Sequence, residues 1–280
     1  MTIDQKLRTH LETIFALLNK EPAGRFPPPS SLSDALEKFV PKRGRITTVP
    51  VQPKIALMFA TAAVEVWMRG VHSFLISTSL TVASPIWASV SGYYSSHYSV
   101  RALAHLLGYF HLFRKKKIVR LEIQNGKYLC LFDPKQRGDR EHRFYWKVVK
   151  DDPHFISDPL FTVNNAEDDV SDVGHRNRAN YADHICAFPN FRALDEETLK
   201  RRVHRISQIP FDAPPKQSRF PDVESVQVVA YHRLVRFRQF VDEILGGGNR
   251  FWKVHRSPSW TREMIDFQLT EQGGLSSLAG

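Results

Sequence analysis

The sequence of 280 residues predicts a mainly helical protein with a small β-hairpin inserted between helices. Three observations support this fold class. Apolar residues recur every three or four positions near residues 3–19, 54–77 and 223–245, which is the period of an amphipathic helix. The apolar period changes to two over residues 119–132, which indicates paired strands. The chain is also long enough to form one large or two small domains whose cores need no disulfide or metal.

The first fifty residues are expected to form a helical arm and a linker. Residues 3–19 predict an amphipathic helix, and the proline-rich stretch that follows cannot continue it. Ser33 or Asp34 can cap a short helix over residues 33–40. Residues 41–53 are interpreted as an exposed basic connector.

The longest run without a charged residue, from Gly70 to Ser96, approaches the length of a membrane span. Pro85 interrupts this run, and Ser and Thr are frequent throughout it. We therefore expect two buried helices joined by a turn near Ser84. The buried positions expected at the end of the first helix are Trp67, Val71, Phe74 and Leu75. The second helix begins after Pro85 and is expected to reach about residue 113.

A β-hairpin is predicted over residues 119–132, because Asn125-Gly126 is a strong type I′ turn signal. Residues 143–149 can add a third strand. Four consecutive cations stand at the entrance of the hairpin: Arg114, Lys115, Lys116 and Lys117. The aromatic residues expected beside them are Tyr128, Tyr145 and Trp146. Phosphate contacts and stacking surfaces together suit single-stranded nucleic acid, whereas a solvated charge run is the alternative interpretation.

The charge balance also favours a polyanionic partner. Lys and Arg number 39 against 29 Asp and Glu, so the formal net charge is +10 and the pI is about 9.7. Such a surplus promotes association with polyanions without identifying them. Nucleic acid is the expected partner, ahead of an acidic protein or a membrane surface. Further basic helix faces are expected at Arg201 and Arg202, and at His232, Arg233, Arg236 and Arg238.

The two cysteines, Cys130 and Cys186, lie in apolar surroundings, and their spacing fits no zinc site. We expect reduced core thiols, no metal and no cofactor. The amino terminus carries charges through an amphipathic pattern and does not look like a secretory signal. These features predict a cytoplasmic protein.

The segment GHRNRANYADHI, residues 174–185, is the strongest candidate for chemistry. Arginine can clamp phosphate oxygens, and histidine can exchange a proton with a ribose hydroxyl or a leaving oxygen near neutral pH. On an ideal helix Arg178 and His184 point about 120° apart. Either the helix ends before His184, or a second copy of the chain completes the site. The alternative is a solvated helix face or structural hydrogen bonds.

Two segments together resemble the HEPN family of helical nucleotide-binding domains. Its first motif matches Tyr93, Tyr94, His97, Arg101, Ala102 and Leu103, and its later Arg…His motif matches Arg178 and His184. Ala179 follows Arg178, where a polar residue is typical of the family. The resemblance implies a bundle of four or five helices, often dimeric, that acts as a metal-independent endoribonuclease or a nucleotide-binding module, commonly in toxin or antiviral defence systems.

The roles that the resemblance implies fall on residues 174–185. His184 would be the general acid or base, Arg178 the phosphate clamp, and Asn180 and Tyr181 the orienting residues, with Arg176 as a further nucleic-acid contact. A second pair, Arg101 and His105, lies one helical turn apart and is interpreted as a polar contact at the core edge.

The predicted organisation is a helical arm (1–50), a HEPN-like bundle (51–210) with a β insertion at about 115–150, and a carboxy-terminal helical extension (211–280). The predicted function is an RNA-targeting effector, a candidate metal-independent endoribonuclease. The alternative is a non-enzymatic subunit that binds nucleic acid or a partner protein through a degenerate HEPN-like bundle. The expected partners are RNA and either a second copy or another subunit, without a membrane.

Overall fold

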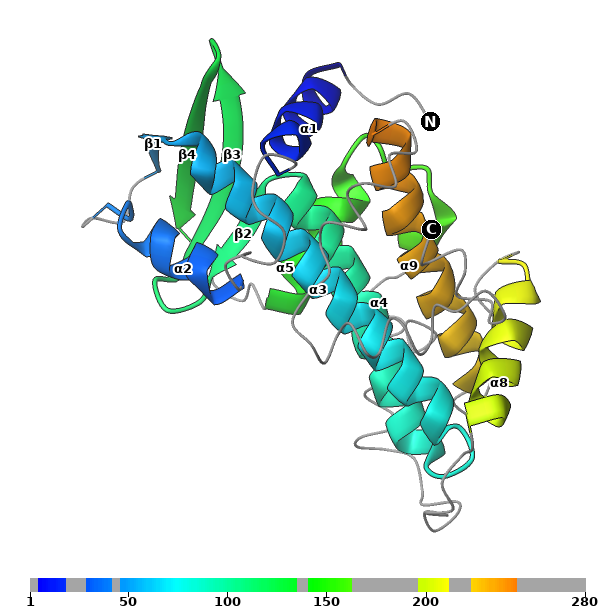
Figure 1. Cartoon of the computed structure of the whole chain (residues 1–280). Coiled ribbons are helices and arrows are strands. Elements are labelled where there is room, and N and C mark those ends of the chain that lie inside the picture. The colour runs from blue at the N-terminus through cyan, green and yellow to red at the C-terminus, as the bar shows by residue number, and fades with distance from the viewer. Residues whose placement is uncertain are drawn as a thin grey trace. The chain divides into compact units, whose positions relative to one another are not determined.

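The computed structural model of the chain describes residues 5–18, 29–41, 46–134, 141–162, 196–211 and 223–245 (Figure 1). Contacts divide the chain into two compact units. Unit 1 comprises Met1–Val66, Val100–Ile156 and Phe240–Ser257. Unit 2 comprises Trp67–Ser99, Ser157–Gln239 and Pro258–Gly280.

Most of the described residues are helical, as the sequence predicts. The helices are α1 (Gln5–Leu18), α2 (Pro29–Glu37), α3 (Pro53–Leu80), α4 (Pro85–Leu106), α5 (Glu141–Asp151), α6 (Pro159–Thr162), α8 (Glu196–Gln208) and α9 (Val223–Leu245). The long amphipathic periods therefore located α1, α3 and α9 correctly. The prediction for α2 is wrong at its start, because the helix begins at Pro29, where the fixed φ of proline favours the first helical position.

Unit 1 contains a four-stranded antiparallel sheet in the order β1-β4-β3-β2. The strands are β1 (Thr47–Val51), β2 (Tyr109–Leu112), β3 (Lys117–Gln124) and β4 (Lys127–Pro134). The predicted hairpin is confirmed as β3–β4. Asn125 and Gly126 have φ angles of 50° and 73°, and a type I′ turn requires positive φ at both positions.

The two other strands were not predicted. Residues 47–51, expected as part of a connector, pair with β4 from Thr47↔Phe132 to Val51↔Tyr128. The helix expected to reach residue 113 ends at Leu106 instead. Gly108 has a φ of 86°, and a Cβ there would lie 2.9 Å from the Leu121 carbonyl oxygen. Only glycine allows this close approach, which turns the chain from α4 into the sheet.

The predicted strand over residues 143–149 is wrong, because this segment belongs to α5. Phe144, Tyr145 and Val149 are buried and Arg143 and Lys147 are exposed, which is a helical arrangement. Both α2 and α5 pack on β2. The Phe59 ring of α3 meets the Phe110 ring of β2 edge to face at 6.1 Å in the same core.

Unit 2 confirms the two helices expected in the uncharged run. The segments of α3 and α4 on either side of Ser84 pack with α9, and all four expected core residues of α3 are buried. The Trp67 indole stacks on Phe237 and donates a hydrogen bond to the Leu234 carbonyl at 3.0 Å. No helix among the described residues is long and apolar enough to cross a membrane.

Candidate functional site

The predicted cleavage motif cannot be placed in the structure. Residues 163–195 lie outside the described residues, and they include Arg176, Arg178, Asn180, Tyr181 and His184, together with Cys186. The other half of the HEPN resemblance lies on α4, where Tyr93, His97, Ala102 and Leu103 are buried and Tyr94 and Arg101 are half-buried.

The predicted basic run forms the connection between β2 and β3, which we call the basic turn (Phe113–Lys116). Leu112 and Lys117 pair at its base, and the Lys116 amide donates a hydrogen bond to the Phe113 carbonyl at 3.2 Å. Arg114, Lys115 and Lys116 are all exposed. The sheet therefore projects three cations from one tight turn, as a phosphate-binding surface requires.

Phe113 is a candidate binding residue that the sequence analysis missed. Its side chain is 71% exposed and directly precedes the three cations. The centres of the Phe113 and His111 rings lie 6.4 Å apart, in an edge-to-face arrangement. The aromatic residues expected to provide stacking surfaces, Tyr128, Tyr145 and Trp146, are buried, so that prediction is wrong. The position of Phe113 beside a cationic run was the available signal, but Phe113 was assigned to the helix.

Lys117 does not belong to this surface. It is the first residue of β3, is only 6% exposed, and lies on the same buried face as Val119 and Leu121. Its Nζ atom has no hydrogen-bond partner in the described part of the chain. The prediction that Lys117 contacts nucleic acid is therefore wrong, because pairing of β3 with β2 and β4 turns its side chain into unit 1.

The Arg101–His105 pair is a structural contact, as expected. His105 is fully buried; its Nδ1 donates to the Tyr109 carbonyl at 2.9 Å, and its Nε2 accepts from Arg101 Nε at 3.3 Å. Burial, with a further contribution from the Arg101 charge, lowers the pKa of His105 from 6.5 to about 3. The ring is therefore neutral near neutral pH and has both nitrogens engaged.

Tyr145 holds this contact in place from α5. The Arg101 guanidinium lies 5.3 Å from the centre of the Tyr145 ring, a cation–π distance. The Tyr145 hydroxyl accepts a hydrogen bond from the His111 amide at 3.1 Å. This chain of contacts links α4, α5 and β2 and thereby supports the strand that leads into the basic turn.

The arginines of α8 differ in exposure and in their partners. Arg201 is exposed and bonds only within its own helix, to Thr198 Oγ1 at 3.2 Å, among the interactions described. Arg202 is half-buried and donates to the Thr78 carbonyl in the last turn of α3 at 3.4 Å. Arg205 pairs with Glu224 at 2.9 Å. Only Arg201 of the two predicted contacts on α8 is presented to solvent.

The prediction that α9 presents a basic face to solvent is wrong. Arg233 and Arg238 are buried, and Arg233 Nε donates to the Leu160 carbonyl at 2.8 Å. Arg236 Nε lies 2.8 Å from Asp158 Oδ2. His232 is half-buried, with its Nε2 2.8 Å from the Ile209 carbonyl. Arg233 and Arg236 attach residues 158–160 to α9, a contact with no signal in the local sequence.

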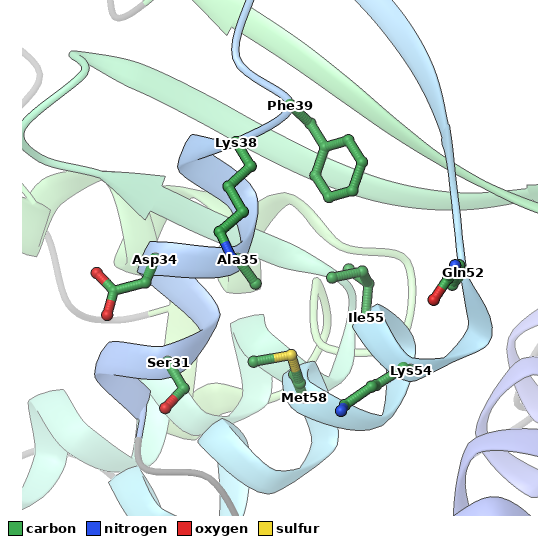
Figure 2. A pocket seen from close by; sticks show the side chains of 9 residues that line it. All are labelled: Ser31, Asp34, Ala35, Lys38, Phe39, Gln52, Lys54, Ile55 and Met58. Atoms are coloured by element: carbon green, nitrogen blue, oxygen red, sulfur yellow. The ribbon is translucent and has the colours of Figure 1, made fainter.

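A pocket of about 350 Å³ lies elsewhere in unit 1, between α2 and the junction of β1 with α3 (Figure 2). Its apolar walls are formed by Ala35, Phe39, Ile55 and Met58. Polar groups at its rim include Asp34, Lys38, Gln52 and Lys54. The sequence analysis missed this pocket because it did not recognise β1, whose end positions the start of α3.

The described residues contain no group of three or more His, Cys, Asp or Glu side chains placed to hold a metal ion. Comparison of the chain with protein-family models, curated protein sequences and solved structures found no match.

Proposed function

We propose that this protein binds single-stranded RNA, with the basic turn as a principal contact. The observation that carries the proposal is the exposed Phe113 ring followed by the exposed Arg114, Lys115 and Lys116. Stacking of a base on an aromatic ring contributes about 1–3 kcal/mol, and lysine and arginine bind phosphates with release of counterions. A single strand is favoured over a duplex because its bases are free to stack on a protein ring.

The backbone of the basic turn supports the same proposal. Lys116 has a φ of 48°, in the left-handed region that glycine and asparagine adopt at lower cost. A lysine at this position sacrifices some local stability and presents a third cation beside Phe113. Residues in such backbone conformations cluster at ligand-binding and active sites.

The proposal is tested by fluorescence anisotropy with a labelled single-stranded RNA. We expect Phe113→Ala to weaken binding about fivefold or more, from the lost stacking energy. The triple variant R114A/K115A/K116A is compared with R69A/K127A/K147A, which removes three other exposed cations and gives the same net charge. Equal affinity of the two triple variants would reject the basic turn as the interface.

RNA cleavage is the second candidate function, favoured by the Arg178…His184 motif and its partner motif on α4. His184 would transfer the proton while Arg178 holds the phosphate, and the ribose hydroxyl would be the nucleophile. Because this route needs no metal, we expect cleavage of labelled single-stranded RNA in EDTA. Cleavage should disappear in His184→Ala and persist in His204→Ala, which replaces an exposed histidine of α8. Absence of cleavage by the unmodified protein would leave RNA binding alone.

A further inference from the structure

The pocket between α2 and α3 has an apolar interior that the side chains of its lining residues do not fill. Ile55 and Met58 of α3 are buried at its base, and Ala35 of α2 and Phe39, two residues beyond the end of α2, form the opposite wall. Figure 2 shows Phe39 and Ile55 on either side of the hollow. Its volume of about 350 Å³ is near the lower limit for small-molecule sites, so the pocket suits a small ligand.

Two ammonium groups border this apolar hollow, one from the turn after α2 and one from α3. Lys38 directly follows the last residue of α2, and Lys54 lies in the first turn of α3; neither forms a hydrogen bond or ion pair in the described part of the chain. In Figure 2 the Lys54 side chain extends from α3 back toward α2. Asp34 is the one carboxylate among the lining residues, so the rim carries a net positive charge.

The start of α3 adds to this positive potential. The Gln52 carbonyl accepts the first hydrogen bond of the helix from the Ile55 amide at 2.9 Å, and Pro53 occupies the first helical position. The amino-terminal end of a helix of 28 residues carries a partial positive charge, which favours a nearby anion. The two lysines and the amino-terminal end of α3 therefore all favour an anionic group at the rim of the apolar pocket.

We propose that this pocket binds a small amphipathic acid, with an apolar body against Phe39, Ile55 and Met58 and a carboxylate or phosphate group between Lys38 and Lys54. The apolar walls exclude a highly hydrated inorganic ion as the preferred ligand. The two lysines disfavour a cationic ligand of the same size. The site is separate from the basic turn, so this proposal does not depend on RNA binding.

Four ligands with the same eight-carbon chain test the head group: octanoate, octyl phosphate, octanol and octylammonium. Binding is measured by isothermal titration calorimetry with the full chain. We expect the two acids to bind about threefold to tenfold more tightly than octanol, because each exposed ion pair contributes modestly, and octylammonium to bind most weakly. The tighter of the two acids identifies the preferred head group. Equal binding of all four ligands would overturn the proposal.

Variants locate the ligand. K38A/K54A should reduce the affinity for the acids to that for octanol, whereas R143A/K147A, which removes two exposed cations of α5 that do not line the pocket, should not. Ala35→Trp fills the hollow from a half-exposed position and should abolish binding of all four ligands without lowering the melting temperature. Unchanged binding in K38A/K54A or in Ala35→Trp would place the ligand elsewhere and refute the site.

Discussion

At the scale of single residues, burial decides which histidines can exchange protons near neutral pH. Burial lowers the pKa of His105 to about 3 and that of His10 to about 4. Both rings are therefore neutral in the folded protein at physiological pH. Neither is suited to be a general acid or base there, and the cleavage hypothesis assigns that role to His184 instead.

The His105 pKa predicts how stability depends on pH. Its folded-state pKa lies below the value of 6.5 for an exposed histidine, so the unfolded chain binds the proton first as the pH falls. The contribution of neutral His105 to the unfolding free energy is complete above pH 6.5 and is lost progressively as the pH falls toward 3. A histidine with such a lowered pKa reduces the unfolding free energy of the protein by about 2 kcal/mol when the pH falls from 7 to 5.

In His105→Gln we expect this part of the pH dependence to disappear, whatever the overall stability of the variant. Urea denaturation at pH 7 and pH 5 measures the difference in unfolding free energy for the two proteins. A wild-type difference no larger than that of the variant would contradict the buried, neutral state of His105.

Lys117 provides a second prediction about one residue. Its buried Nζ atom lacks a hydrogen-bond partner in the described part of the chain, and a buried polar group without a partner is destabilising. Lys117→Met keeps the length of the side chain and removes the amine. We expect a higher melting temperature, corresponding to about 1–2 kcal/mol, and unchanged RNA affinity. A lower melting temperature would show that the amine makes a stabilising contact.

At the scale of elements, the sequence predicted helices better than strands. Apolar periodicity located α3 and α9 because apolar residues recur along more than twenty residues of each, and many of them are buried. It missed β1 and β2, which have five and four residues and are fixed by pairing with β4 and β3. Such short strands take their conformation from distant partners, which local periodicity does not report.

The end of α3 illustrates how distant side chains complete a helix. Gln227 of α9 is buried, and its Nε2 donates to the Ser77 carbonyl at 3.0 Å and lies 2.8 Å from Thr81 Oγ1. The Ser77 carbonyl also accepts from Thr81 Oγ1 at 3.3 Å, so the Gln227 amide is a second and shorter contact to the end of the helix, where carbonyls lack partners from a following turn.

We therefore expect Gln227→Leu to lower the unfolding free energy by about 1–3 kcal/mol. Hydrogen exchange should also accelerate in the last turns of α3. Arg202→Ala is the comparison, because its contact with the neighbouring Thr78 carbonyl is longer, at 3.4 Å, and should contribute less. A larger loss in Arg202→Ala than in Gln227→Leu would contradict this assignment.

At the scale of the whole molecule, composition indicates a polyanionic partner but does not say which cations are exposed to bind it. The run at 114–117 was correctly identified as basic, yet strand pairing exposes its first three residues and buries the fourth. The arginines of α9 are buried or paired with Asp158 although the local sequence suggested a solvent-facing side. Burial of this kind arises from contacts between segments far apart in the sequence, which spacing alone does not reveal.

The net charge of +10 predicts electrostatic attraction for any polyanion, so salt dependence separates this general effect from the basic turn. For single strands, the slope of log K against log salt is about −0.7 for each phosphate contact. Removing Arg114, Lys115 and Lys116 should make the slope less negative by up to about 2. Phe113→Ala should lower the affinity with little change in slope, because stacking releases no counterions. If R69A/K127A/K147A changed the slope as much as R114A/K115A/K116A, RNA would be held by the overall charge of the protein and not by this turn.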